Sequence, residues 1–534
     1  MKSFRFVAPK SSSGEVLGCH FSPHPGPLPS GEGERIAAIG LVGCQRLVWS
    51  GRAVTLSSGR GQGEGKHDAR PIRSARADTA SLDRNALIVR SERASVLIIV
   101  LWITFGLVST ALYFGHSMLF EFRASDNHTA GVEAEQAIEG AARYIAYALT
   151  NLTQPGQFPE LQWYDVENVP VGESLYWLIG RTNLSTQLDR NETPRFGLVD
   201  EASKLNLNTA TLEMLQNLPR MTPQLAAAII DWRDEDSDPS QDGAETETYS
   251  RLNPPYQSKN GRFESSEELR FLFGADAETL YGEDYNRNGI LDPNENDGDL
   301  SWPVDNRDGK LDPGILEFVT VFSLEANTRT NGSPRVDVNA GGTNLTQLLQ
   351  EQFEQARVNE IQQRVASTTN RSVLEFFLRS GMTAEEFEQI EGDITATNAT
   401  VIEGLINVNT APVEVLACVP GIGWEKAQQV VDYRQSKGQI LTSLAWVAEI
   451  LDQTSAIQAG PYLTARSYQF TADIAAVGHH GRGYRRTAFV FDISEGAPKI
   501  IYRRDLGRPG WALGPLVRQR LAQAKETGVA TRMR

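Results

Sequence analysis

The chain has 534 residues, and its 51 Lys and Arg against 67 Asp and Glu give a formal net charge of −16. This length allows several domains with an ample buried core, so neither a metal nor a disulfide is needed merely for folding. From Ser95 onward the chain holds 37 basic and 59 acidic residues, a net of −22. Such a surface repels phosphate backbones and attracts cations, so we expect no nucleic-acid partner and consider divalent metals instead.

The N-terminal region, residues 1–80, is rich in Gly, Ser, Pro and Arg and has no helical or strand periodicity, which predicts disorder. Within it, residues 23–34 read PHPGPLPSGEGE, a string that resembles translated intergenic repeat DNA. We therefore interpret residues 1–94 as a disordered leader or misannotated extension, and we expect the natural start between Leu82 and Val89.

A stretch of 19 uncharged residues, VLIIVLWITFGLVSTALYF, follows at residues 96–114. As a helix it reaches ~28 Å, close to the thickness of a bilayer core. Arginines precede it and acidic residues follow from Glu121, which predicts a single pass with a cytoplasmic N-terminus and an external acidic part. The alternative is a buried core helix. Apolar residues continue at helical spacing to Leu149 and Pro155 ends the pattern, so one long helix is predicted over 95–155.

The part beyond this helix contains an internal duplication. Residues 205–233 align without gaps with residues 406–434 at an offset of 201. Each copy has an Asn-x-Asn-Thr turn, a short apolar helix, a hairpin that opens at proline and a second helix. A weaker third copy starts at Val336. These features predict an inserted helical domain over 201–460 that contains helix-hairpin-helix-like repeats.

The second copy reads PGIGWEKA at residues 420–427, a hairpin whose glycine N–H groups can hold a DNA phosphate. This leaves open the alternative of a membrane-anchored helix-hairpin-helix protein that binds or takes up DNA. The acidic charge argues against it, as does the shortage of basic residues, since only Lys426 and Arg434 are near. In the first copy, Met221 and Thr222 replace the glycine turn.

Residues 284–295, DYNRNGILDPNE, satisfy the calcium-loop pattern D-x-[DN]-x-[DN]-G-x5-E in full. An ordinary Asn/Gly/Asp turn is the alternative, but every ligand position is filled. The predicted ligands are Asp284, Asn286, Asn288, the carbonyl of Ile290, Asp292 and Glu295.

A second, poorer loop follows over 304–315. It offers Asn306, Asp308 and Asp312, but Val304 and Ile315 occupy its end positions, so Asp305 or Glu317 would have to substitute. Both loops fall in a predicted calcium-loop insertion at about 275–320.

An acidic cluster follows the first repeat. Its carboxylates repel one another unless solvent or a cation screens them, which leaves a solvated loop and a metal site as equal alternatives. The candidate ligands are Asp234, Asp236, Asp238, Asp242 and Glu245.

Three apolar or alternating segments near the C-terminus, 467–477, 485–494 and 498–506, predict an antiparallel meander within residues 461–515, followed by a tail over 516–534. Turns of sequence GHHGRG and EGA separate these strands. We interpret the pair His479 and His480 as part of a turn, because no carboxylate constellation is near in the sequence.

Two groups of motifs resemble known families. Residues 93–102, RASVLIIVLW, are similar to a prepilin leader, in which a peptidase cuts just before the hydrophobic helix; Ala94 replaces the usual Gly, and cleavage would make Ser95 the first residue. Ile99 then stands where most pilins carry Glu. Pseudopilin K proteins typically lack that Glu as well. The segments DEASKLNLNTA, IIDWRDEDSDPSQDGAE, LNPPYQSKNGRFESSEEL and GLINVNTAPVEVL resemble, in order, motifs of the minor pseudopilin K family of type II secretion systems.

The resemblance implies an α+β, pilin-like fold: a long N-terminal transmembrane helix packs on an antiparallel sheet, whose first part lies in 156–200, and a large helical domain is inserted. It implies structural Ca²⁺ held by acidic loops. It also implies a position at the tip of the secretion pseudopilus, where the protein nucleates assembly with minor pseudopilins I and J and other pseudopilins.

Further partners implied are the prepilin peptidase and the inner-membrane secretion platform. The expected location is the inner membrane, with the large C-terminal part in the periplasm. The chain has no nucleophile elbow, P-loop, HExxH or Rossmann fingerprint, so we expect no catalytic residues and no enzyme activity. An unrelated calcium-dependent hydrolase remains an alternative.

Overall fold

The computed structural model describes residues 85–152, 156–159, 166–180, 194–340, 343–366, 368–437 and 441–527. The expected disorder of residues 1–80 lies outside this part. Ala94 and Ser95 fall within a helix, but side chains before Val96 are not among those described, so the cleavage site stays a prediction.

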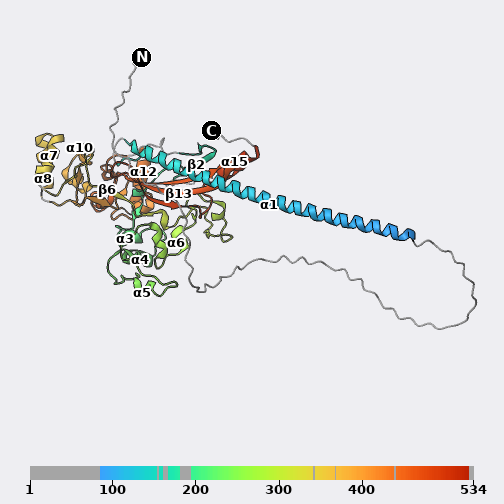
Figure 1. Cartoon of the computed structure of the whole chain (residues 1–534). Helices are drawn as coiled ribbons and strands as arrows, with labels where there is room; N and C mark the ends of the chain where they lie inside the picture. The colour runs from blue at the N-terminus through green and yellow to red at the C-terminus, as the bar shows by residue number, and fades with distance from the viewer. Residues whose placement is uncertain are drawn as a thin grey trace, which may run out of the picture. The chain divides into compact units, whose positions relative to one another are not determined.

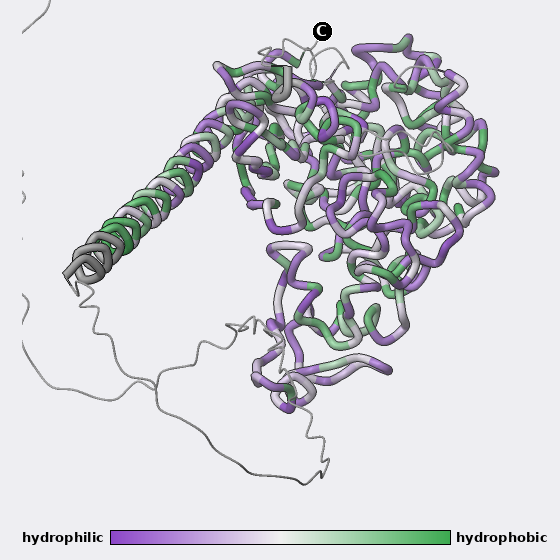
Figure 2. The backbone as a smooth tube through the Cα atoms, turned by 90° about the vertical axis from the view of Figure 1, so that its right-hand side faces the viewer, coloured by the Kyte–Doolittle hydropathy of each residue, from purple (hydrophilic) through white to green (hydrophobic). Residues whose placement is uncertain are grey.

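Helix α1 (Asn85–Thr150) is the longest element and has two different halves. The large apolar side chains from Val96 to Phe122 are exposed, as expected of a segment that faces lipid, and Figure 2 shows the apolar stretch along the projecting part of the helix. Its second half buries a stripe of small and branched side chains from Ala134 to Leu149 against a sheet. The helix ends at Thr150, five residues before the predicted end at 155.

The sheet runs in the order β1 (Val169–Val171), β2 (Ser174–Ile179), β12 (Gln469–Gly478), β13 (Arg482–Asp492) and β14 (Lys499–Asp505), and β3 (Val199–Asp200) also pairs with β12. All its pairs are antiparallel. This confirms the predicted α+β class and the C-terminal meander.

Each face of the sheet has its own apolar layer. On one face, Leu178, Phe470 and Phe491 pack with α1. Figure 1 shows α1 running along the sheet beside β2 and β13. On the other, Trp177 and Val477 pack with Leu513, Val517 and Leu521 of α15 (Gly514–Thr527) or the turn before it. The segment predicted as a tail therefore contains a helix that covers the sheet.

The inserted region between β4 and β11 is built from short helices around one core. Its α-helices are α3 (Leu212–Gln216), α4 (Pro223–Arg233), α5 (Thr246–Tyr249), α6 (Ala277–Tyr281), α7 (Thr343–Gln352), α8 (Gln355–Val365), α9 (Val373–Ser380), α10 (Ala384–Ile390), α11 (Val413–Ala417), α12 (Gly423–Lys437), α13 (Val447–Ile450) and α14 (Gln453–Ala459). Short 3-10 helices in the head are η1 (Glu201–Ser203), η2 (Ser266–Phe271), η3 (Pro293–Glu295), η4 (Ile315–Glu317), η5 (Gly460–Tyr462) and η6 (His479–Gly481).

Three two-stranded parallel pairs mark three copies of the repeat. They are β4 (Leu205–Asn206) with β5 (Val319–Thr320), β7 (Val336–Asp337) with β8 (Ile394–Thr395), and β10 (Ile406–Asn407) with β11 (Leu463–Thr464). A separate antiparallel pair joins β6 (Leu324–Ala326) to β9 (Val401–Glu403).

Each copy is braced by one asparagine two residues after its first strand. The Asn208 amide exchanges two hydrogen bonds with the backbone of Phe263, and Asn409 does the same with Leu441. In the middle copy, Asn339 makes the equivalent pair with Asn370. The weak third copy that begins at Val336 thus adopts the same local structure. The inserted domain therefore contains three such units, whereas the sequence duplication identified two clearly.

Candidate functional site

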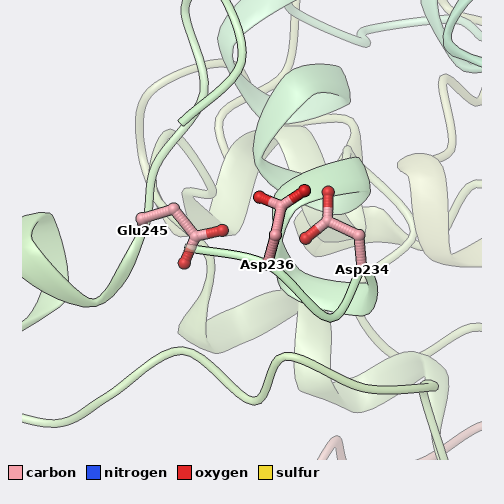
Figure 3. A group of neighbouring side chains, drawn as sticks. All are labelled: Asp234, Asp236 and Glu245. Atoms are coloured by element: carbon pink, nitrogen blue, oxygen red, sulfur yellow. The ribbon is translucent and has the colours of Figure 1, made fainter. Parts of the chain in front are cut away.

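The acidic cluster after α4 brings three carboxylates together. Asp234 caps the C-terminal end of α4, Asp236 follows it, and Glu245 is the N-terminal cap of α5. One oxygen from each lies within 4.8 Å of the others (Figure 3). Asp238 and Asp242, two further candidate ligands, are exposed and do not belong to this group.

The electrostatics of this group suit a cation. Burial, followed by the nearby charges of Asp236, Asp231 and Glu245, raises the pKa of Asp234 to about 6. The nearby charge of Arg233 lowers this pKa and offsets the increase only in part, and its guanidinium donates to the Leu207 and Ala210 carbonyls.

Glu245 supplies an independent sign that this group could hold a cation. It is 3% exposed; its Oε2 accepts from Ser258 Oγ at 2.9 Å, while its Oε1 is buried without a hydrogen-bond partner. Buried carboxylate oxygens are normally satisfied, and clustered hard oxygen donors are what Ca²⁺ takes.

The loop 284–295 folds around an inward-facing polar centre. Asp284 accepts from the backbone N–H groups of Asn288 and Gly289, each at 2.9 Å. Asp292 Oδ2 accepts from the amides of Asn286 and Asn288 at 2.6 and 2.9 Å. The Ile290 N–H donates to Asn288 Oδ1.

Two oxygens of this loop are buried without hydrogen-bond partners, Asn286 Oδ1 and Glu295 Oε1. Glu295 is fully buried, and burial with the adjacent charge of Asp284 raises its pKa to about 9. Its other oxygen accepts from the Asp292 N–H at 3.1 Å. Among the described residues, the carboxylates of this loop do not form a group with oxygens within 4.8 Å of one another, as Asp234, Asp236 and Glu245 do.

The second loop is held largely by the protein itself. Arg220 pairs with Asp312 at 2.6 Å, and the Asn306 and Asp308 side chains accept backbone N–H groups within the loop. The buried Glu283 accepts from the N–H groups of Asn306 and Asp312, each at 3.1 Å. Sequence reasoning missed Glu283; its position directly before Asp284 gave no sign that it binds the following loop.

Asp305 and Glu317, the two substitute ligands proposed for this loop, lie in different surroundings. Asp305 is buried, and its carboxylate accepts from the N–H groups of Gly298 and Arg307. Glu317 lies in η4. With Asp312 already in an ion pair, this loop fits a cation less well than the other two.

The interpretation of His479 needs correction. It lies at a hairpin tip, as predicted, but it is also buried between two carboxylates of α1: Nε2 is 2.9 Å from Asp126 and Nδ1 is 2.6 Å from Glu133. These partners are more than 340 residues away in the chain, so inspection of neighbouring sequence could not find them.

The sequence places two basic residues beside the glycine hairpin between α11 and α12. Both make contacts within the protein. Lys426 pairs with Asp452 at 2.7 Å, and the buried Arg434 donates to the Val408 carbonyl. Gly421 and Gly423 have positive φ values of 85° and 65°, as such a turn requires. The turn geometry is thus present, but Lys426 and Arg434 make their contacts within the protein, which favours a packing role over DNA binding.

Comparison with known proteins matches residues 181–281 to the family model "Type II secretion system (T2SS), protein K". These residues, about a fifth of the chain, are therefore similar to a domain of the type II secretion protein K family. Residues 401–445 match the helix-hairpin-helix motif, which agrees with the second repeat of the sequence.

Two curated relatives are both named type II secretion system protein K. The one from Klebsiella pneumoniae is 42% identical over 69 residues, 13% of this chain, and the one from Pectobacterium carotovorum subsp. carotovorum is 38% identical over 68 residues, 12% of this chain. The match spans 21% of the length of either relative.

A solved structure, the GspK-GspI-GspJ complex from the enterotoxigenic Escherichia coli type 2 secretion system, is also similar to this chain. The similarity covers 72% of this chain and 99% of the solved one at 11% identity. The TM-score is 0.35, which is too low to carry an argument about this fold.

Proposed function

We propose that this chain is a minor pseudopilin that caps the pseudopilus of a type II secretion system and nucleates its assembly for protein export across the outer membrane. The observation that carries this is the continuity of α1: an exposed apolar segment leads directly into an Ala- and Ile-rich face that packs on an antiparallel sheet. A protein K domain match in the same chain supports the specific position.

The membrane anchor in this proposal is residues 96–114. An 18-residue window in the described part of α1 has a mean hydropathy of 2.3, and none of it is buried by the rest of the chain. Arginines before the segment and acidic residues after it favour a cytoplasmic N-terminus, an inner-membrane location and a periplasmic head. The prepilin peptidase would act at the Ala94–Ser95 bond.

The proposed partners are the minor pseudopilins I and J, other pseudopilins and the inner-membrane secretion platform. In the solved Escherichia coli complex, GspK is bound together with GspI and GspJ. We extend this partnership to the present chain because of the domain match at 181–281. A role in assembly needs no catalytic residues, and we propose none.

We propose that calcium has a structural role in this head. The group Asp234, Asp236 and Glu245 would hold one ion and the 284–295 loop another, since both place buried, unpartnered oxygens beside carboxylates. Bound calcium supplies positive charge and oxygen coordination that tie loop segments together. The residues themselves position the loops: Ser258 orients Glu245, and the Asn288 and Gly289 N–H groups orient Asp284.

A binding experiment tests the assembly role. The full chain in detergent is incubated with the separately purified heads of minor pseudopilins I and J, and complexes are recovered on a tag carried by this chain. Co-elution of both heads, with no mobility shift of duplex DNA at low salt, is expected. Failure to retain either head together with a salt-sensitive DNA shift would favour the DNA-binding alternative.

A further inference from the structure

Arg486 of β13 is a cation buried inside the sheet. Its side chain is 0% exposed, and it makes a two-point ion pair with Asp473 of β12: Nε donates to Oδ1 at 2.8 Å and Nη2 to Oδ2 at 2.6 Å. Removing two charges from water is costly, and their attraction offsets that cost only when the other donors are also satisfied. The remaining contacts of this guanidinium therefore show what it holds in place.

The other N–H groups of Arg486 bind the backbone of the 284–295 loop. Nη1 donates to the carbonyl of Asn286, and Nη2 donates to the carbonyl of Arg287 at 2.8 Å. Arg287 has a φ of 55°, a left-handed conformation that is uncommon for a residue other than Gly. Arg486 thus fixes the strained turn between two proposed ligands, Asn286 and Asn288.

A second contact ties the same loop to the segment before α15. Asn286 Nδ2 donates to the Trp511 carbonyl at 3.2 Å and also to Asp292, which leaves Oδ1 as the buried, unpartnered oxygen of that side chain. Just beyond Trp511, Ala512 and Leu513 are fully buried and pack with Trp177 on the outer face of the sheet. One side chain therefore offers its oxygen to the proposed ion and its NH₂ group to the C-terminal segment.

A third contact runs through Glu267 of η2. Its carboxylate pairs with Arg504 of β14 and lies 3.7 Å from Arg287 Nη1. Three separate connections, from β13, β14 and the turn before α15, therefore converge on the first half of the loop, between residues 284 and 288.

We propose that Arg486 is a positioning residue that couples cation occupancy of the 284–295 loop to the seating of the sheet and α15 on the inserted domain. This rests on the proposed function in one respect, that the loop binds calcium. A cation that requires the loop conformation held by Arg486 must stabilise the docked arrangement by the same factor by which docking raises the affinity for the cation.

The Asp473 partner has a defined part in this coupling. An uncompensated guanidinium beside the loop would repel a divalent cation, whereas the pair with Asp473 leaves the site facing a neutral unit whose donors point at carbonyls. Replacement of Asp473 is therefore expected to weaken calcium binding, although Asp473 lies on β12 and outside the loop.

The experiment measures calcium binding to the full chain in detergent by isothermal titration, with the wild type, R486Q, R486K, D473N and E295Q. The matched control is R335Q, which breaks another buried ion pair, Arg335 with Glu325 at 2.6 Å, whose partners lie outside the loop. E295Q is expected to remove one binding event. R486Q and D473N are expected to lower the affinity of that event by at least about tenfold, R486K by less, and R335Q not at all.

Hydrogen exchange on the wild type covers the case in which a variant does not fold. Calcium is expected to slow exchange in β12, β13 and residues 511–521; unchanged exchange there would overturn the coupling. Equal calcium affinity in R486Q and R335Q would also overturn it, while the calcium site itself would stand. If E295Q retains every binding event, the calcium proposal for this loop fails instead.

Discussion

His479 Nδ1 lies 2.6 Å from Glu133 Oε2, and this contact joins the tip of the β12–β13 hairpin to helix α1. The other ring nitrogen faces Asp126, which also pairs with Arg482. The hairpin tip therefore contacts α1 beyond its apolar segment, where a membrane anchor would join the head.

The contacts of His479 with α1 predict that H479A is less stable than the wild type. The substitution leaves two α1 carboxylates without their imidazole partner, so the free energy of unfolding is expected to fall by about 1 to 3 kcal/mol in chemical denaturation. The adjacent His480 is exposed, and H480A serves as the control with little expected change. Equal effects of the two variants would show that the buried contacts of His479 contribute nothing.

The contact between Glu133 and His479 is expected to be sensitive to acid. The hydrogen bond with His479 is the largest cause that lowers the pKa of Glu133 below its ordinary value of 4.5. A carboxylate with a lowered folded pKa stabilises the fold above its unfolded pKa, and this contribution is lost as pH falls through the folded pKa. Denaturation at a series of pH values below about 5 should show a steeper loss for the wild type than for E133Q; parallel curves would contradict the assignment.

Close backbone contact at the same place predicts that G483A disrupts docking. A Cβ at Gly483, whose φ is 66°, would lie 2.3 Å from the Gly131 nitrogen of α1. The helix and hairpin would have to separate, at a cost of at least about 2 kcal/mol. G140A is the control, because a Cβ there meets nothing within 4 Å; it should leave the unfolding midpoint unchanged or raise it slightly.

Chelation of calcium is expected to lower the melting temperature of the purified chain. An ion present at about a hundred times its dissociation constant contributes about 2.7 kcal/mol to the folded state, which corresponds to a shift of several degrees in calorimetry. E245Q and E295Q should each reduce the shift caused by EDTA, whereas E235Q, at an exposed position beside the cluster, should not. An EDTA response that is absent in the wild type would remove the structural role of calcium.

Local patterns in the sequence were sufficient for much of this architecture. The uncharged run after Val96, the helical spacing to Leu149 and the alternation in 467–506 each encode one element through its own period, and the structure contains all three. The duplication was visible because its two copies share spacing without gaps. The copy at Val336 is weaker, since what it retains is the turn and the asparagine brace at Asn339.

Contacts between residues far apart in the chain could not be predicted from the sequence. Of the acidic cluster, the chain order could not show that Asp234 and Asp236 meet Glu245 while Asp238 and Asp242 turn outward, because loop geometry decides this. The contacts of His479 with α1 and of Arg486 with the 284–295 loop join residues about 200 or more apart. No periodicity or motif encodes such contacts; they follow from how the sheet seats on both the helix and the inserted domain.

The most direct measurement is photocrosslinking in native inner membranes, with a photoreactive residue placed on an exposed position of α1 such as Leu101 or Tyr113. A membrane-anchored minor pseudopilin should give adducts with other pseudopilins, pellet with membranes and resist carbonate extraction. A chain recovered in the soluble fraction with no pseudopilin adduct would contradict it.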